Sequence, residues 1–169
     1  DVVSAAVRTI VGIDPGVTGA LVALLTTRDQ VLAATPMPVL TDRNGKSLVD
    51  AAGVLRFLLE NGAGHIYLEQ VNAMPARGKA GEARTMGATS AFNFGRGFGV
   101  LEGVAACAQV PLTYVPPATW KKRAGLTGTE KDFARTAALR LFPSAGDLLK
   151  RKKDVGIADA MLIARYGGT

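Results

Sequence analysis

The sequence predicts an α/β fold that forms one domain over residues 1–169. Short apolar segments typical of strands alternate along the chain with longer amphipathic segments typical of helices. The 169 residues are enough for a hydrophobic core, and 48% are hydrophobic and 20% charged, as in globular domains. Since no internal repeat, low-complexity segment or linker interrupts the alternation, nothing indicates a second domain.

The composition also limits the kind of site that the chain can build. Cys107 is the single cysteine, so no internal disulfide forms, and His65 is the single histidine, which excludes a His-rich zinc site. No apolar run is long enough to span a membrane, and the cysteine usage fits the cytoplasm, that of a host cell if the protein is phage-encoded. The start at Asp1 rather than Met leaves an organelle as the alternative location, after removal of a leader. A net charge of +6 favours a nucleic acid as partner over simple solubility charge.

The first candidate functional residue of the chain is Asp14. Thr9–Ile13 is expected to be a strand whose residues 10–13 are apolar or Gly on both faces, as in a central strand, and it ends at Asp14. The Pro15-Gly16 turn stops the strand, and Gly19–Leu25 returns as the second strand. Asp14 is therefore expected at a strand end, beside backbone that a phosphate can approach. An ordinary hairpin with Asp at its turn explains this stretch equally well.

The elements that follow Leu25 contain a second candidate carboxylate, Glu69. We expect a strand at Gln30–Met37, a polar turn at 41–46 and a helix at Ser47–Asn61. A strand at His65–Val71 and a loop at Asn72–Ala83 follow. Ser47 and Asp50 are expected to form a capping box at the start of the helix. Glu69 lies near the end of its strand, as Asp14 does.

The second half of the chain is predicted to be mainly helical. We expect a long helix at about Arg84–Gln109 and a strand at Leu112–Val115. Two shorter helices follow at Thr119–Arg123 and Thr129–Phe142, then a charged loop at Pro143–Lys153 and a last helix at 155–167. Thr129 and Asp132 are expected to cap the second of these shorter helices.

The long helix has small residues at every fourth position, on one face. They are Gly87, Ala91, Gly95, Gly99, Gly103 and Cys107. Each glycine costs about 1 kcal/mol relative to alanine within a helix, so a close backbone contact is expected in return. Packing on the protein's own sheet and a contact between two copies are the two candidates. The nearby Phe92, Phe94 and Phe98 are expected in the core or the interface rather than stacked on bases.

A third carboxylate, Asp159, lies in the apolar helix segment GIADAMLIA. It shares a face with Leu162, Ile163 and Tyr166, and a carboxylate facing the core needs a partner because an isolated buried charge is costly. No Lys or Arg lies three or four residues away from it. A metal ion is therefore the expected partner, and a site whose ligands are all oxygen atoms indicates Mg²⁺ or Mn²⁺.

Several motifs resemble those of the RuvC-like Holliday-junction resolvases, which belong to the RNase H/retroviral-integrase superfamily. The resemblance spans about residues 9–167 and is strongest to the phage and organellar branch. Its motifs are GIDPG at 12–16, LEQV at 68–71, SAFNFGRGFGVLEGV at 90–104, VPPATWKKRAGL at 115–126 and KKDVGIADAMLIARYG at 152–167. It implies an RNase H-like mixed five-stranded sheet flanked by helices. Asp14, Glu69 and Asp159 match the metal ligands of the family, and Lys121 and Lys131 match basic residues near the scissile phosphate.

The sequence departs from the family at two positions. The fourth ligand of the family is an acid or histidine three or four residues before the last carboxylate, where this chain has Gly156 and Val155. Asp154 is the nearest acid, and we take it as the fourth ligand, with capping of the helix as the alternative role. An aromatic residue that enters the junction in bacterial members is replaced by Asn72, which moves any wedge elsewhere in Asn72–Arg84.

The resemblance implies an endonuclease that resolves four-way DNA junctions by paired, Mg²⁺-dependent hydrolysis. The approximate two-fold symmetry of a junction favours a homodimer. Basic residues are expected to bind the DNA phosphates, and they are Arg77, Lys79, Arg84, Lys121, Lys122, Arg123 and Lys131, with further charges at 150–153. Two other functions remain open, a junction-binding protein that does not cleave and an actin-like kinase or ATPase. The second needs two lobes, for which 169 residues are few.

Overall fold

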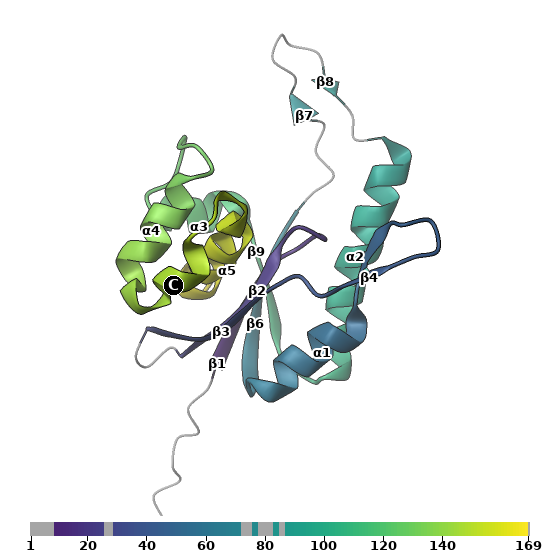
Figure 1. The fold of residues 1–169 in the computed structure, drawn as a ribbon, viewed down its shortest axis with the longest axis horizontal. Helices are drawn as coiled ribbons and strands as arrows, with labels where there is room; N and C mark the ends of the chain where they lie inside the picture. The colour runs from purple at the N-terminus through teal and green to yellow at the C-terminus, as the bar shows by residue number, and fades with distance from the viewer. Residues whose placement is uncertain (1–8, 26–28, 72–75, 78–82, 85–86, 169) are drawn as a thin grey trace, which may run out of the picture.

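The structure is a computed structural model that describes residues 9–25, 29–71, 76–77, 83–84 and 87–168. A mixed sheet of five strands lies at the centre, in the order β3-β2-β1-β6-β9 (Figure 1). The strands are β1 (Thr9–Asp14), β2 (Ala20–Leu25), β3 (Gln30–Pro36), β6 (Ala63–Glu69) and β9 (Leu112–Val115). β1–β2 and β2–β3 pair antiparallel, whereas β1–β6 and β6–β9 pair parallel. The predicted sheet is therefore confirmed, including its strand count and mixed direction.

β1 is the central strand, as its continuous apolar sequence predicts. Val11 and Ile13 are buried on one side of the sheet, against α1 (Ala51–Glu60) and α2 (Ala88–Cys107). On the other side, Gly12 lies directly against α5 (Val155–Tyr166), where a Cβ atom would meet the carbonyl oxygen of Ala160. The missing side chain of Gly12 lets α5 pack closely on β1, which sets the position of Asp159.

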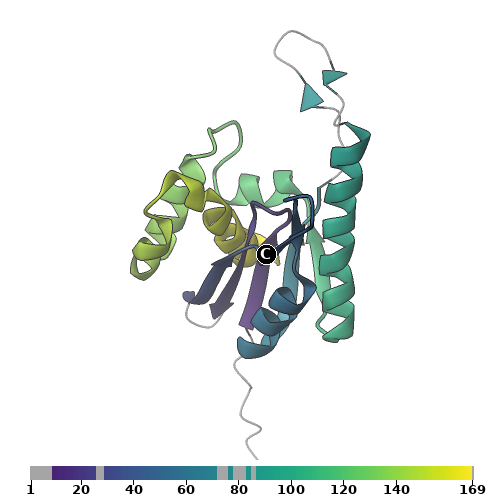
Figure 2. The same ribbon diagram turned by 45° about the vertical axis from the view of Figure 1, so that its right-hand side comes forward.

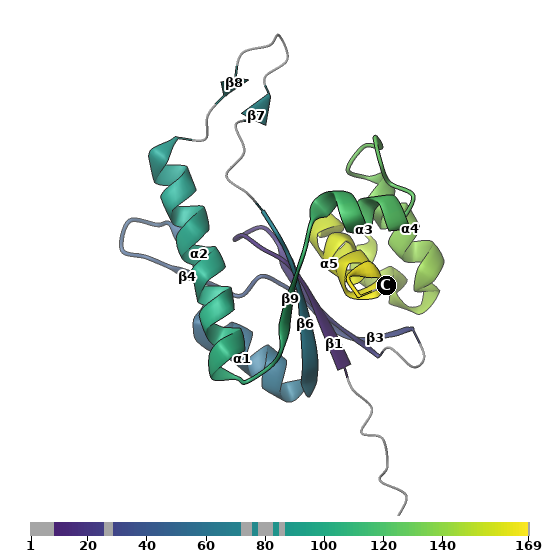
Figure 3. The same ribbon diagram turned by 180° about the vertical axis from the view of Figure 1, so that it is seen from behind.

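Helices cover both faces of the sheet (Figures 1 and 2). α1 and α2 pack on one face and enclose one hydrophobic cluster. α5, α4 (Phe133–Leu141) and α3 (Pro117–Arg123) cover the other face and enclose a second cluster, which includes the buried Trp120. Seen from behind, α3 and α5 lie beside one another next to β9 and β6 (Figure 3). No helix within the described ranges is long and apolar enough to cross a membrane.

The predicted helix start at Ser47 is wrong. Ser47–Val49 is a strand, β5, which pairs with β4 (Val39–Thr41) in a hairpin. The polar turn between them is confirmed, because the Asp42 carboxylate accepts hydrogen bonds from the backbone N–H groups of Asn44 and Lys46. α1 begins only after Asp50, whose side chain accepts from the N–H of Ala52 as its N-cap.

Other boundaries differ mainly at helix starts. α4 begins at Phe133, and no capping box forms because the Thr129 hydroxyl instead donates to the carbonyl oxygen of Leu126. The predicted charged loop is compact, with two 3-10 helices, η1 (Pro143–Leu149) and η2 (Lys152–Asp154). Within the predicted loop after β6, two-residue strands β7 (Ala76–Arg77) and β8 (Ala83–Arg84) pair antiparallel.

The small-residue stripe of α2 does not pack on the sheet. Cβ atoms added at Gly87, Gly95, Gly99 or Gly103 would meet no atom within 4 Å. α2 instead packs through Leu101, Val104 and Ala105, which are buried on its other side. Of the two explanations for the stripe, the intramolecular one is therefore excluded within the described residues.

Candidate active site

The fold brings Asp14 and Glu69 together at one edge of the sheet. β1 and β6 run parallel with Ile13 opposite Leu68, so the next residue on each strand is a carboxylate. Parallel neighbours end at the same edge, which places both side chains at the strand ends as predicted. Each is half-buried.

Asp159 approaches this pair from α5, which lies across the same face of β1. Ala158 and Ala160 on either side of it are fully buried, whereas Asp159 itself is half-buried. Burial and the nearby negative charge of Glu69 raise the pKa of Asp159 to about 7. Burial, followed by the charges of Asp159 and Glu69, raises the pKa of Asp14 to about 8. The three carboxylates therefore share one electrostatic environment and repel one another.

Lys121 and Lys131 face this acidic group from α3 and from the turn before α4. Their positive charges act against the rise in pKa at both Asp14 and Asp159. Both lysines line one hollow of about 180 Å³ together with Trp120 and Asp159. The hollow is thus an opening beside the carboxylates in which an anion would meet two ammonium groups.

Trp120 holds Glu69 in place. Its indole N–H donates to Glu69 Oε1 over 3.0 Å, and its side chain is 1% exposed. The ammonium group of Lys121 lies 5.3 Å from the centre of the same indole ring, close enough for a cation–π contact. One buried ring therefore orients both a carboxylate and a lysine of the site.

Asp154 does not join the other carboxylates. Its side chain is 4% exposed and accepts hydrogen bonds from the backbone N–H of Arg151 at 2.8 Å and from its guanidinium at 2.9 Å. This hydrogen bonding lowers the pKa of Asp154, and Asp154 is not among the charges that raise the pKa of Asp14 or Asp159. Both oxygens of Asp154 are bound to Arg151, so the geometry does not favour Asp154 as fourth ligand, and that role stays a prediction.

The alternative role of Asp154 as a cap is also modified. Its side chain makes no capping hydrogen bond to α5 and instead closes the η2 turn with Arg151. At Gly156, where the resemblance places a ligand, an added Cβ would lie 3.4 Å from Asp14 Oδ2. That position is beside the site as expected, but glycine offers no donor atom there.

The remaining basic residues divide into several groups. Lys122 is exposed on α3, whereas the Arg123 guanidinium donates to the carbonyl oxygen of Tyr166 at the end of α5.

Arg77 and Arg84 have described backbone in β7 and β8, but their side chains lie outside the described residues, as do Lys79 and Asn72. Lys150 and Arg151 form ion pairs with Asp147 and Asp154. Lys121 and Lys131 are thus the predicted DNA contacts that the structure places beside the carboxylates.

The three carboxylates offer only oxygen ligands, which Mg²⁺ and Mn²⁺ prefer. As the side chains stand, the described residues contain no group of three or more His, Cys, Asp or Glu already arranged to bind a metal ion. However, neighbouring negative charge raises the pKa of Asp14 and of Asp159, and a divalent cation bound between the carboxylates would remove this repulsion. Asp14, Glu69 and Asp159 therefore fit such an ion, with small side-chain adjustments.

Two features of the site were missed by the sequence reasoning. Trp120 is the only tryptophan of the chain and precedes Lys121, so its place in a motif with basic residues was a usable signal. The hydrogen bond to Glu69 joins residues 51 positions apart, and no local pattern indicates it. The ion pair of Asp154 with Arg151 was readable, because the two lie at positions i and i+3.

Comparisons with known proteins identify the fold. No protein-family model and no curated protein matches this sequence. The structure is similar to that of Thermus thermophilus RuvC in complex with a Holliday junction substrate, with 18% identity, a TM-score of 0.57 and coverage of 94% of this chain and 90% of that chain. A second Thermus thermophilus RuvC structure matches with 17% identity, a TM-score of 0.54 and coverage of 94% and 92%. Together with the mixed five-stranded sheet, these matches show that this chain has the RNase H-like fold of RuvC.

Proposed function

We propose that this protein is a structure-selective endonuclease that resolves four-way DNA junctions by metal-dependent hydrolysis. The supporting observation is the meeting of Asp14, Glu69 and Asp159 with Lys121 and Lys131 on a RuvC fold. Acidic side chains repel DNA unless cations are bound, so this combination suits phosphodiester hydrolysis better than simple DNA binding. The net charge of +6 supplies the attraction for the DNA backbone.

The three carboxylates would hold Mg²⁺ or Mn²⁺ ions at the end of β1 and β6. Such ions, when bound, activate a water molecule and stabilise the leaving 3′ oxygen. Trp120 keeps Glu69 Oε1 in a fixed direction through its N–H, which leaves the other oxygen for the site. Gly156 leaves the Asp14 carboxylate uncrowded at the start of α5.

Lys121 and Lys131 would bind the phosphate that is cut. Both are exposed on the rim of the hollow that contains Asp159, so a backbone phosphate can reach them without burial of the duplex. Lys122, on the exposed side of α3, would contact the phosphates next to it. These contacts position the DNA and do not select its sequence.

The proposed assembly is a homodimer. A four-way junction has approximate two-fold symmetry and needs two cuts, and two identical subunits provide two sites at a fixed separation. The open stripe of α2 supports this assembly, because three glycines in mid-helix are destabilising and gain no contact within the described chain. Close approach of the same helix from a second copy would compensate their cost.

A labelled synthetic four-way junction tests the proposal directly, with a duplex of the same sequence as control. We expect nicking of the junction in Mg²⁺, none in EDTA, and little or none of the duplex. Asp14→Asn and Glu69→Gln should abolish nicking and bind the junction with equal or higher affinity, since each removes only negative charge near DNA. Cleavage that persists in either variant would contradict the assignment of these two ligands.

The alternative of a junction-binding protein without cleavage activity is tested by the same experiment. It is supported by the side chains at the fourth-ligand positions, because neither Gly156 nor Val155 can bind a metal ion. Tight binding of the junction without nicking at any Mg²⁺ or Mn²⁺ concentration would establish it. The fold lends no support to the kinase alternative, since the described residues contain one five-stranded sheet rather than two such lobes.

A further inference from the structure

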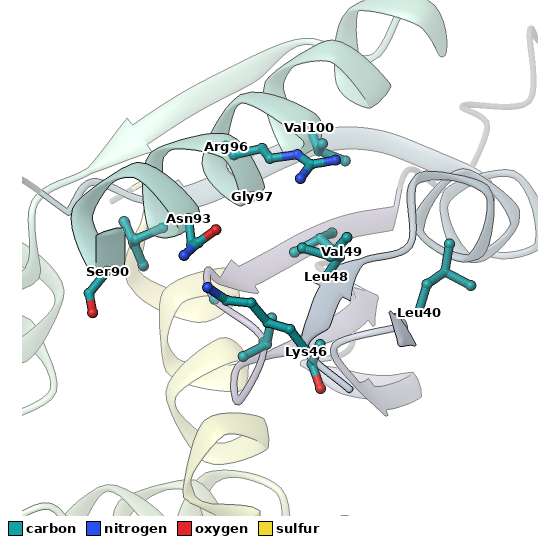
Figure 4. Close-up of a pocket in the computed structure, with 13 residues that line it drawn as sticks. Leu40, Lys46, Leu48, Val49, Ser90, Asn93, Arg96, Gly97 and Val100 are labelled. Atoms are coloured by element: carbon teal, nitrogen blue, oxygen red, sulfur yellow. The ribbon is translucent and has the colours of Figure 1, made fainter. Parts of the chain in front are cut away.

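A second cavity lies beside the site, between α2 and the β4–β5 hairpin (Figure 4). Its volume is about 420 Å³, within the range of sites for small molecules. It is lined at one end by Gly16 and Val17, in the turn that follows Asp14. An atom of the Phe94 ring would lie 3.5 Å from a Cβ placed on Gly16, so this ring forms the wall that adjoins the turn.

The lining is mostly apolar and partly open to solvent. Leu40 is 56% exposed and Val17 is 44% exposed, although both are large hydrophobic residues. Leu48, Val49 and Val100 complete the apolar wall. An exposed apolar surface that adjoins a catalytic strand end indicates a binding site rather than chance exposure.

The polar residues of the cavity are basic or neutral. Lys46 extends from the hairpin toward Asn93 on α2, and Arg96 lies along α2 above Val49 (Figure 4). No acidic residue of the described ranges lines the cavity, and neither Lys46 nor Arg96 forms an ion pair with a carboxylate in those ranges. The cavity therefore suits a ligand that has a flat apolar part and a negative charge.

A single nucleotide of DNA has both properties. Every base has an apolar face that stacks on an aromatic ring such as that of Phe94, and its phosphate is an anion for Lys46 or Arg96. A duplex is too wide for a cavity of about 420 Å³, so the nucleotide must leave its stack. Unstacking is least costly for bases that lack a neighbour, as at the branch point of a junction.

The cavity stays accessible in the proposed dimer. Gly95 and Gly99 each lie two residues from Gly97, which is about 200° around the helix, so the stripe and the cavity are on opposite sides of α2. A second copy on the stripe therefore leaves Asn93, on the side of α2 opposite Gly95, free for DNA.

We propose that this cavity binds one unstacked nucleotide of the DNA substrate next to the catalytic carboxylates. This inference rests on the proposed function, because it assumes that branched DNA is the substrate. The base lies between Phe94 and the hairpin, and Lys46 and Arg96 bind the adjoining phosphates. The cavity thereby holds the branch point at a fixed distance from Asp14 and contributes to selectivity for junctions over duplex.

Junctions that contain 2-aminopurine test the inference, because this base becomes brighter when it leaves the stack. The label is placed in turn at each position around the branch point, and binding is measured in EDTA so that no cleavage occurs. We expect a several-fold rise at one or two positions with the wild-type protein. Asn93→Phe, which fills the cavity, should abolish the rise, whereas Thr89→Phe, on the same helix but outside the cavity lining, should preserve it.

Charge variants provide a second test that does not depend on packing. Lys46→Gln and Arg96→Gln should reduce the rise and weaken junction binding several-fold, whereas Arg43→Gln, in the turn of the same hairpin, should have little effect. A junction that is bound and then nicked in Mg²⁺, but shows no rise at any position, would overturn this inference and leave the proposed function intact. A rise that survives Asn93→Phe would also overturn it. Absence of junction binding by the wild-type protein would overturn both proposals.

Discussion

The indole of Trp120 links the hydrophobic core to the chemistry of the site. Its ring is buried among residues of α4 and α5, and its N–H is the only polar group it offers, so burial makes a hydrogen-bond partner necessary. Glu69 is that partner. The direction of the carboxylate is therefore set by the packing of Trp120 against α4 and α5, on the same side of the sheet.

Trp120→Phe should slow metal-dependent cleavage by about 10-fold or more, the usual effect when a residue that orients a metal ligand is lost. Phenylalanine keeps the ring for packing and for Lys121 but removes the N–H. We therefore expect a higher Mg²⁺ concentration at half-maximal rate, while junction affinity in EDTA is unchanged. Nicking rates measured over an Mg²⁺ titration decide the matter, and an unchanged titration would show that the hydrogen bond does not position Glu69.

Asp154→Asn distinguishes the structural role of this residue from the predicted role as metal ligand. Asparagine can still accept from the N–H of Arg151 but loses the ion pair with its guanidinium. We expect cleavage at the wild-type rate and a small loss of stability, on the order of 2–4 °C in melting temperature for a domain of this size. Strong loss of cleavage at low Mg²⁺ with an unchanged melting temperature would restore the ligand role.

At the scale of the element, α2 has one face on the core, one face on the cavity and one open face. Leu101, Val104 and Ala105 pack inward, whereas a Cβ added at the glycines of the stripe would meet no atom of the described residues within 4 Å. Gly99→Leu should lower self-association by about 10-fold or more if a second helix approaches there, while the monomer folds normally because there is open space at this position. Light scattering over a range of concentrations gives the association constant.

Thr89→Leu on the same helix, off the stripe, serves as the control and should not change association. An equal mass for the wild type and Gly99→Leu at every concentration would exclude the stripe as the dimer contact. In that case Gly99→Ala should raise the melting temperature, since about 1 kcal/mol of helix propensity is gained without loss of a contact.

The strands were easier to predict than the helix starts, for reasons that differ between elements. β1, β2 and β6 are mostly apolar in their buried parts and end at turns or carboxylates, so pattern alone located them to within a few residues. Ser47–Val49 could extend a helix or form a strand, and the partner that decides, Val39–Thr41, is separated from it by a turn. The α4 capping box failed because Thr129 found a partner in the preceding turn.

The site was predictable where one residue type at an element end has few explanations. A carboxylate at the end of a buried strand or within an apolar helix is such a case, and Asp14, Glu69 and Asp159 come together as expected. Trp120 and the cavity arise from contacts between distant segments, which a single sequence does not contain. Asp154 has a local partner in Arg151, a residue whose charge the sequence equally predicts to bind DNA, so its role as metal ligand stays a prediction.

At the scale of the whole molecule, folding brings carboxylates together at one end of the sheet while the chain keeps a net charge of +6. The global positive charge weakens as pH rises, which reduces self-repulsion and favours folding. The site acts in the opposite direction. The pKa of Asp14 is raised from 3.8 to about 8 and that of Asp159 to about 7, so folding favours their protonated forms.

We therefore expect the ionisation of Asp14 and Asp159 to lower the stability of the metal-free protein as pH rises from about 4 to about 8. A carboxylate whose pKa is raised by folding contributes full stability below its ordinary value of 3.8 and loses it as pH passes the folded value. Asp14→Asn lacks the part of this dependence that belongs to Asp14 but keeps the part that belongs to Asp159 and the remaining charges. In EDTA, its melting temperature should match the wild type near pH 4 and exceed it at pH 8 by roughly 2–4 °C or more.

Mg²⁺ should remove this difference, since an ion that binds only the folded site stabilises it and binds best when the carboxylates are ionised. The wild-type melting temperature should rise with Mg²⁺ at pH 8 and little at pH 5, whereas Asp14→Asn should respond weakly at both. Comparison of the two proteins at each pH cancels the effect of global charge, which they share apart from one group. Equal melting curves for the two proteins in EDTA at pH 8, with no response to Mg²⁺, would show that the carboxylates do not repel one another and do not form a metal site.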